Sequence, residues 1–297
     1  MNNTISIIII GYNSKKNLES LLQSINQLII QDNKIEVIYI DDGSNDNSLD
    51  YFINYKLIFS KKYFGFDKNK GRVYASQKGI ELASGDWLLM LQSNVIVNNN
   101  LIIEYNKSIN NDNILAIVGN ICYQSHDKIF MNYLNNKNRG INKYKNIQPI
   151  HYRYLLFGNS LIKRHIFNQI NLNLNLKFYG GEELDFAFKL NNKFPNSIIN
   201  CNSATVTRIN FPSYKNHLKR LQEYGKYNLE LLNPILQKEV IKWPMLIHNN
   251  NKLLKLSYQL IFLLCQLFYR IPVINFYVIR LGMLMAIIKG YHSKSTK

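Results

Sequence analysis

The chain has 297 residues, and its 36 Lys and Arg against 19 Asp and Glu give a formal net charge of +17 at pH 7. A hydrophobic content of 46% with 19% charged residues excludes a disordered chain, and the length fits one large α/β domain or two smaller ones. Three scattered cysteines, Cys122, Cys201 and Cys265, exclude a disulfide framework and a zinc site.

The positive charge is concentrated towards the C-terminus. Residues 210–297 contain 13 basic and 3 acidic side chains, net +10, whereas residues 1–209 contain 23 and 16, net +7. Such a field favours anionic partners, which include nucleic acid, phosphorylated substrates and an anionic membrane surface. Composition alone does not choose among the three.

The first hundred residues alternate between predicted strands and predicted helices. Apolar, β-branched runs predict strands buried on both faces over residues 5–10, 35–40 and 87–91, with a short strand near 57–59. Apolar residues at helical spacing predict helices from about residue 18 to 28, over 47–52 and over 73–83. The alternation predicts a doubly wound, mostly parallel α/β sheet with right-handed crossovers.

Polar residues directly follow three of these strands. They are Tyr12, the pair Asp41-Asp42 and the triplet Gln92-Ser93-Asn94. In doubly wound sheets ligands bind beyond the carboxyl ends of the strands. We therefore expect these side chains to converge on one cleft.

The second half of the chain is less regular. Residues 105–150 are polar apart from a strand-like stretch at 114–123, and a further strand is expected over 155–162. Gly180-Gly181 precede Glu182 and Glu183 at the start of a helix that continues to about residue 190, and a helix N-terminus favours negative charge. From residue 214 onward the chain is predicted to be mostly helical.

Each of these motifs is ambiguous when taken alone; Asp41-Asp42, for example, could be a turn or a helix cap. Their order and spacing along the chain are more specific. In succession, the motifs after the first, second and fourth strands and the Gly-Gly motif with paired acids resemble the family 2 glycosyltransferases of the GT-A fold. That family transfers a sugar from a nucleotide-sugar donor with inversion. The resemblance covers about residues 4–230. It implies a GT-A domain over 1–212, with a nucleotide-binding half at 1–100 and an acceptor half at 101–212, and then a basic helical extension over 213–297.

The resemblance also implies a donor site. Tyr12 would stack on the nucleotide base, Asp42 would accept hydrogen bonds from the base, and Asp41 would lie near the base or ribose. Arg72 sits where the family chain passes the nucleotide. The triplet Gln92-Ser93-Asn94 would lie beside the donor, with Gln92 and Asn94 as its contacts.

An acceptor site is implied in the same way. Gly158-Asn159-Ser160 resembles the family segment on the floor of the sugar and acceptor site, so Asn159 and Glu182 would contact the acceptor. Glu183 stands where the family has its general base, usually an Asp. It would take the proton from the acceptor hydroxyl as that hydroxyl attacks the anomeric carbon. Without the resemblance, the same acids could simply stabilise a helix N-terminus.

The triplet departs from the family, which usually has Asp-X-Asp there to hold Mg²⁺ or Mn²⁺ on the donor diphosphate. Hard divalent cations prefer anionic oxygens, so Gln92-Ser93-Asn94 should hold a metal poorly. We therefore expect no metal or other cofactor, and cationic side chains would offset the diphosphate charge instead. The candidates are Arg72, Lys78, Arg208 and Lys215. The same departure also fits a chain that binds a nucleotide without catalysis.

Two apolar helical stretches lie near the C-terminus. Residues 256–269 and 273–288 are both short of the roughly 20 apolar residues of a membrane span, and Arg280 interrupts the second. We expect them to lie in a membrane interface, with five cations reaching anionic headgroups: Lys255, Arg270, Arg280, Lys289 and Lys294. The alternative is packing against the sheet domain or a second copy. His217, on an amphipathic helix from about residue 214, is expected at the surface or in a cap.

These features predict an inverting glycosyltransferase that moves a sugar to a glycan or lipid-linked acceptor in bacterial surface polysaccharide synthesis. It is expected in the cytoplasm, peripheral to the inner face of the plasma membrane. The alternative is a noncatalytic nucleotide-sugar-binding or glycan-binding subunit of a synthesis complex. Nucleic acid is not an expected partner, because no RNP-like or helix-turn-helix motif accompanies the charge.

Overall fold

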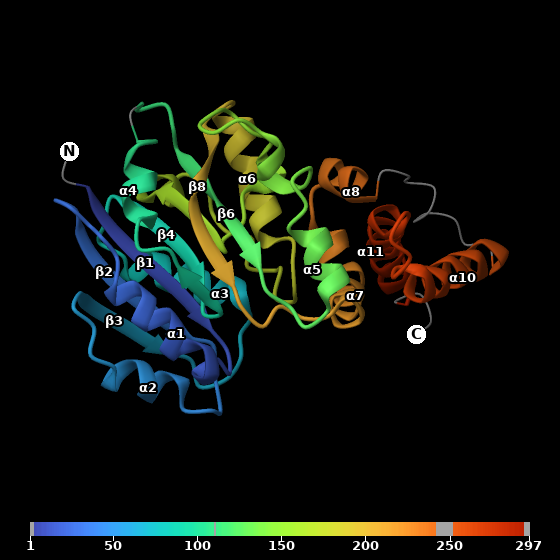
Figure 1. Cartoon of the computed structure of the whole chain (residues 1–297), viewed down its shortest axis with the longest axis horizontal. Coiled ribbons are helices and arrows are strands. Elements are labelled where there is room, and N and C mark those ends of the chain that lie inside the picture. The colour runs from blue at the N-terminus through green and yellow to red at the C-terminus, as the bar shows by residue number, and fades with distance from the viewer. Residues whose placement is uncertain (1–2, 110, 242–251, 294–297) are drawn as a thin grey trace.

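The computed structural model describes residues 3–109, 111–241 and 252–293 (Figure 1). The strands are β1 (Thr4–Gly11), β2 (Lys34–Asp41), β3 (Ser60–Gly65), β4 (Trp87–Gln92), β5 (Val95–Val97), β6 (Ala116–Tyr123), β7 (Asn159–Lys163) and β8 (Ile198–Arg208). The helices are α1 (Lys15–Asn26), α2 (Ser48–Asn54), α3 (Arg72–Leu82), α4 (Leu101–Asn106), α5 (Lys128–Leu134), α6 (Glu182–Lys193), α7 (Tyr214–Glu223), α8 (Pro234–Ile241), α10 (Lys252–Phe268) and α11 (Asn275–His292).

All eight strands form one sheet in the order β3-β2-β1-β4-β7-β6-β8-β5. β3, β2, β1 and β4 pair in parallel, as do β6 and β8, whereas β7 and β5 run in the opposite direction. The predicted mostly parallel α/β sheet is therefore confirmed. Gly11 pairs with Asp41 and Ile10 pairs with Gln92, so the segments that follow β1, β2 and β4 leave the sheet at one edge.

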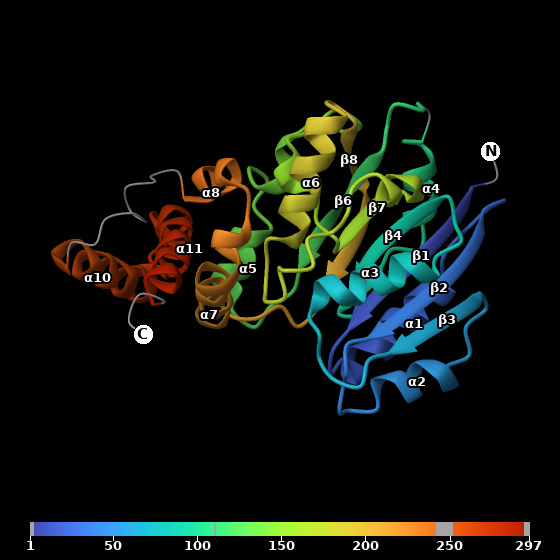
Figure 2. The ribbon, with the colours of Figure 1, turned by 180° about the vertical axis from the view of Figure 1, so that it is seen from behind.

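Helices cover both faces of the sheet because its strands are apolar on both sides. One core joins α1, α2 and α4 to Ile7, Ile9 and Val37, and the other joins α3 and α6 to Ile8 and Ile38. Figure 1 shows α1 in front of the parallel strands, and Figure 2 shows α3 in front of them from behind. This double coverage explains why these strands read as continuous apolar runs rather than as alternating ones.

The structure differs from the sequence prediction mainly after residue 90. β5 and β8 were not predicted, and the polar region 105–150 also contains α5 and a 3₁₀ turn, Gly140–Lys143. β3 lies over Ser60–Gly65 rather than 57–59, and β7 begins at Asn159 rather than at residue 155. β8 escaped prediction because its interior contains Asn200, which is fully buried and satisfied by bonds to the Lys145 carbonyl and to Asn202.

The C-terminal helices pack against each other and onto the sheet domain through α7. The Tyr214 hydroxyl donates to the Ile279 carbonyl at 3.3 Å, and a side chain at Gly225 would collide with the Ile287 carbonyl. α11 therefore packs within the fold. For this helix, the structure agrees with the alternative of packing against the sheet domain rather than with a position in a membrane interface. α10 packs on α11 and lies farthest from the sheet in both views (Figures 1 and 2). Within the described part of the chain, every helix is too short or too polar to cross a membrane.

Candidate active site

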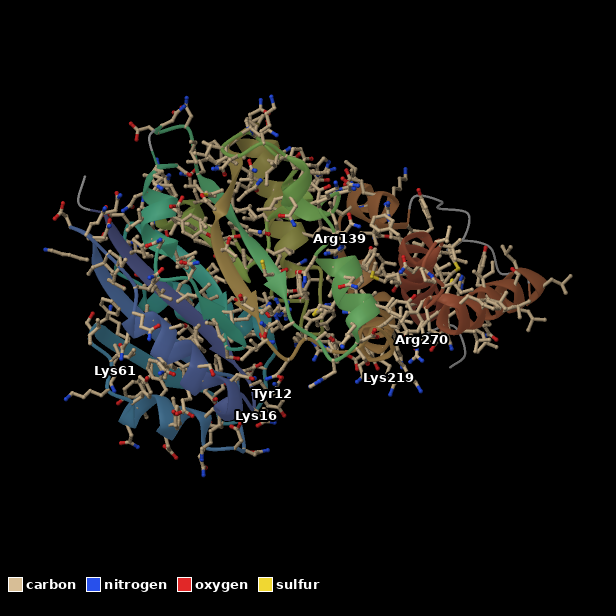
Figure 3. The ribbon with its side chains drawn as sticks, viewed as in Figure 1. Tyr12, Lys16, Lys61, Arg139, Lys219 and Arg270 are labelled. Atoms are coloured by element: carbon tan, nitrogen blue, oxygen red, sulfur yellow. The ribbon has the colours of Figure 1, made fainter. Side chains whose placement is uncertain are left out.

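The end of β1 supplies an exposed aromatic ring. Tyr12 follows Gly11 and is 50% exposed just beyond the strand, where the chain turns towards α1 (Figure 3). A side chain at Gly11 would collide with the Tyr39 and Ser14 hydroxyls, so glycine fits here without moving them. The Asp42 amide donates to the Gly11 carbonyl at 2.8 Å and ties the ends of β1 and β2 together. Tyr12 is thus exposed at this edge of the sheet, and the stacking on a nucleotide base expected of it stays a prediction.

Asp41 stabilises the turn that follows β2. Its carboxylate accepts hydrogen bonds from the Ser44 amide at 2.8 Å, the Ser44 hydroxyl at 2.6 Å and the Tyr39 hydroxyl at 3.2 Å. The side chain is only 4% exposed. These bonds give Asp41 a supporting role, and the donor contact expected of it stays a prediction.

Asp42 holds the segment that leads into α3. Its two carboxylate oxygens accept from the Lys70 amide at 2.8 Å and from the Gly71 amide at 3.1 Å. Burial raises the pKa of the Asp42 carboxyl, and the two amide bonds act against that shift. Gly71 adopts a φ of +96° with the Lys177 carbonyl against it, so this turn requires glycine.

Arg72, the next residue, reaches across to the acids of α6. Its guanidinium lies 2.8 Å from the Glu183 carboxylate and 3.0 Å from that of Glu182. Glu183 also accepts a hydrogen bond from the Phe157 amide at 3.0 Å. Burial raises the pKa of the Glu182 carboxyl, and the Arg72 charge opposes this rise. Arg72 is therefore bound to the predicted acceptor-side acids, and the donor contact expected of it stays a prediction.

The turn before α6 is held by residues beyond the predicted domain boundary at 212. Gly180 and Gly181 have φ values of +86° and +99°, conformations that glycine adopts without strain. The fully buried Asn228 amide donates to the Phe178 carbonyl at 2.8 Å and to the Gly180 carbonyl at 2.7 Å. The Tyr224 ring packs against both glycines. Sequence reasoning missed Asn228 and Tyr224, because a lone Asn or Tyr in a helical stretch carries no motif.

The triplet after β4 does not suit a divalent metal ion. The Asn94 amide nitrogen donates to the Ile209 carbonyl at 3.0 Å, so this side chain is oriented by the protein. Gln92 lies beside Gly158, where a side chain would come within 3.8 Å of its amide. Among the described residues no group of three or more His, Cys, Asp and Glu side chains is arranged to hold a metal ion. The neutral triplet therefore does not fit the metal that the family usually carries.

The four candidate cations have different environments. Lys78 pairs with Glu81 on α3, Lys215 is exposed on α7, and Arg72 is engaged with the two glutamates. Arg208 ends β8 directly beside the triplet, since the Ile209 amide donates to the Asn94 carbonyl at 2.9 Å. Of the four cations, Arg208 is therefore the one that stands next to the triplet without an acidic partner among the described residues.

Two further residues differ from their expected settings. Asn159 is fully buried. Its side-chain oxygen accepts from the Tyr105 hydroxyl, and its side-chain nitrogen donates to the carbonyls of Asn120 and Ala204. It supports the strand ends, and its acceptor contact stays a prediction. His217 is not a surface or capped residue as expected, because its ring packs among Phe130, Phe211 and Tyr179 and its Nδ1 is buried. Burial and the nearby arginines lower its pKa to about 3.

The family is established by comparison with known proteins. Residues 6–170 match the model of glycosyl transferase family 2, so the chain belongs to that family. It is 26% identical over 191 residues to the glycosyltransferase GlyG of Streptococcus pneumoniae, a match that covers 60% of this chain and 62% of GlyG. The chain spans less than two thirds of the length of the first curated relatives that it matches.

Two solved structures share the fold. Staphylococcus aureus TarS 1–349 in complex with UDP-GlcNAc aligns with a TM-score of 0.59 and 13% identity, covering 99% of this chain and 92% of that one. A mannosyltransferase of Pyrobaculum calidifontis in complex with GDP-Man and Mn²⁺ aligns with a TM-score of 0.67 and 12% identity, covering 100% and 88%. The predicted GT-A fold is confirmed.

The Arg72 ion pairs make a prediction about stability. Replacing Arg72 by Gln leaves the 2% exposed Glu182 carboxylate without its cation, and breaking such a buried pair costs about 3 kcal/mol. Urea denaturation should show this loss of unfolding free energy, and Arg72→Gln/Glu182→Gln should recover part of it.

A matched control exists on the same helix. Lys78→Gln on α3 removes the i,i+3 partner of the exposed Glu81 and should cost no more than about 0.5 kcal/mol. Equal losses for Arg72→Gln and Lys78→Gln would contradict the view that Arg72 stabilises the buried acids.

Proposed function

We propose that this chain is an inverting glycosyltransferase that moves a sugar from a nucleotide-sugar donor to a saccharide acceptor, with Glu183 as the general base. The observation that carries the proposal is the contact made by residues 70–72. The Lys70 and Gly71 amides donate to Asp42 at the end of β2. The Arg72 guanidinium donates to Glu183 at the start of α6. One short segment thus joins the residue assigned to the nucleotide and the residue assigned to proton transfer.

The chemistry follows from the placement of Glu183. Its carboxylate removes the proton from an acceptor hydroxyl, and the acceptor oxygen forms a bond to the anomeric carbon of the donor sugar. The bond from that carbon to the nucleoside diphosphate breaks, and the electron pair leaves with the diphosphate. Attack from the face opposite the leaving group inverts the anomeric centre. The Arg72 and Phe157 contacts hold the carboxylate in one position for this step.

The donor assignment is supported by what the similar structures contain. The TarS structure contains UDP-GlcNAc and the mannosyltransferase structure contains GDP-Man. In this chain Tyr12 is exposed directly after Gly11, whose carbonyl accepts from the amide of the 2% exposed Asp42. An aromatic ring and a carboxylate at one edge of the sheet suit a nucleobase, which offers both a flat face and hydrogen-bond donors.

A cavity of about 320 Å³ supports the acceptor assignment. It is lined by polar and apolar side chains that suit a pyranose ring: Asn120, Tyr123, Arg139, Asn142, Tyr154 and Leu156. Leu156 directly precedes Phe157, whose amide binds Glu183. A saccharide in this cavity would therefore lie close to the proposed base.

A membrane-bound acceptor is supported by the surface of α10. Four leucines at helical spacing, Leu256, Leu260, Leu263 and Leu267, are 52–63% exposed and share one face of the helix. Arg270, Arg280 and Lys289 are exposed nearby, whereas Lys294 lies outside the described residues. An apolar face flanked by cations in a segment of net charge +10 matches an anionic membrane surface. We infer a peripheral position at the cytoplasmic face and a lipid-linked or surface glycan as acceptor.

The base assignment predicts a separation of binding from transfer. Glu183→Gln keeps the size of the side chain and removes its basicity, so the single-turnover transfer rate should fall by about 10²- to 10⁴-fold. Affinity for the nucleoside diphosphate product, measured by calorimetry, should stay within about twofold of that of the wild type.

Glu81→Gln on α3 is the matched control, because it removes a carboxylate that pairs with Lys78 at the surface. It should transfer at the wild-type rate. Full activity of Glu183→Gln would refute the base assignment. Binding of a nucleotide by the wild type without transfer from any donor would support the noncatalytic subunit instead.

The membrane assignment predicts selective binding to anionic vesicles. The chain should sediment with vesicles that contain phosphatidylglycerol and stay in the supernatant with phosphatidylcholine alone. Changing Leu256, Leu260 and Leu263 to Ser should weaken binding by about tenfold or more, because three side chains that would be buried in the membrane interface are lost. The control Ile235→Ser removes an exposed apolar side chain of α8 and should leave binding unchanged. Equal sedimentation with both vesicle types would contradict the assignment.

A further inference from the structure

Arg208 is held in a fixed position beside the polar triplet. Its neighbour Ile209 exchanges hydrogen bonds with Asn94, since the Ile209 amide donates to the Asn94 carbonyl and the Asn94 side chain donates to the Ile209 carbonyl. Arg208 itself pairs with Val95 of β5 on one side and with Tyr123 of β6 on the other. The backbone of Arg208 is therefore fixed by strands on both sides, at the place where the family usually has its metal-binding acids.

The guanidinium of Arg208 has no anionic partner among the described residues. It lies over the Phe211 ring, with 4.8 Å between the guanidinium carbon and the ring centroid. Its Nε is buried and makes no hydrogen bond in the described structure. Burial lowers the pKa of Arg208, and Tyr123, Tyr179, Arg72 and Glu183 are the charged or titratable groups around it. An N–H donor that is buried without a partner is unfavourable, and Arg208 is partly exposed, so a bound anion could reach this side chain and supply a partner.

The surroundings of Arg208 are positive overall. The carboxylate that acts on it, that of Glu183, is bound to Arg72. On the other side His217 is held uncharged by burial and by Arg139, Arg220 and Arg208. Three arginines thus act on one small region, in which the Glu183 carboxylate is already bound to Arg72. Such a region attracts an anion and repels a divalent cation.

We propose that Arg208 binds the donor diphosphate directly, in the place that a metal ion takes in relatives with Asp-X-Asp. This inference rests on the proposed function and adds the way in which the diphosphate is held. A guanidinium offers a planar pair of N–H donors that matches phosphate oxygens, and it carries its charge without a metal. As the bond to the sugar breaks, negative charge grows on the leaving diphosphate, and Arg208 stabilises it there.

Calorimetric titration of the full chain with UDP and with GDP tests the proposal. For the diphosphate that binds, the affinity should be the same in EDTA and in Mn²⁺. Arg208→Gln should weaken it by about 10- to 100-fold, the range of a hydrogen-bonded charge pair. Affinity for the matching nucleoside, uridine or guanosine, should be unchanged by this substitution, because a nucleoside has no phosphate.

Lys219→Gln is the matched control, because it removes one exposed cation from α7 and lowers the net charge equally (Figure 3). It should leave diphosphate affinity within about twofold of the wild-type value. An Arg208→Gln variant that binds the diphosphate like the Lys219→Gln control would overturn the proposal. So would wild-type binding that disappears in EDTA and returns with Mn²⁺, a result that does not depend on how any variant folds.

Failure of this inference can be told apart from failure of the proposed function. If the diphosphate binds only with Mn²⁺, or binds independently of Arg208, the proposed role of Arg208 is wrong. The proposal of sugar transfer with Glu183 as base is not affected by that result. If neither diphosphate nor the CDP and dTDP counterparts bind with or without Mn²⁺, the nucleotide site itself is contradicted and both proposals fall.

Discussion

The ion pairs of Arg72 with Glu182 and Glu183 are the interaction on which the site depends. They join α3, which belongs to the parallel half of the sheet, to α6, which belongs to the second half. Gly71 makes the connection possible, because its positive φ turns the chain against Lys177 and aims Arg72 at α6. Buried carboxylates are tolerated there because a cation lies within 3 Å of each.

The cationic side chains of the chain differ in whether an acidic partner lies beside them. Arg72 is neutralised by glutamates, whereas Arg208 keeps its charge beside a triplet that has lost its acids. Arg270, Arg280 and Lys289 are exposed on the same C-terminal helical pair as the exposed leucines of α10, at the far end of the molecule (Figure 1). Arg208 and the exposed cations near α10 therefore have separate locations and separate proposed anions, a diphosphate and a membrane surface.

The sequence predicted the parallel half well, because its strands are continuous apolar runs and its turns carry Asp41-Asp42 and Gly71. It failed for β8, because Asn200 is buried by bonds that only the folded chain provides. The Gly-Gly motif with its acids was found, but the support from Asn228 was not, since 48 residues separate that side chain from the Gly180 carbonyl it binds. His217 was misplaced because the aromatic rings around it come from α5, residue 211 and the segment before α6.

A family 2 site without the usual metal-binding acids is proposed here to transfer sugar by inversion. A turnover screen with UDP-, GDP-, CMP- and dTDP-sugars and a panel of saccharide acceptors, each in EDTA and in Mn²⁺ and followed by NMR of the anomeric centre, tests it most directly. We predict that one donor is consumed at the same rate in both conditions and gives a product of inverted configuration. Retained configuration, consumption that requires Mn²⁺, or no consumption of any donor would contradict the account.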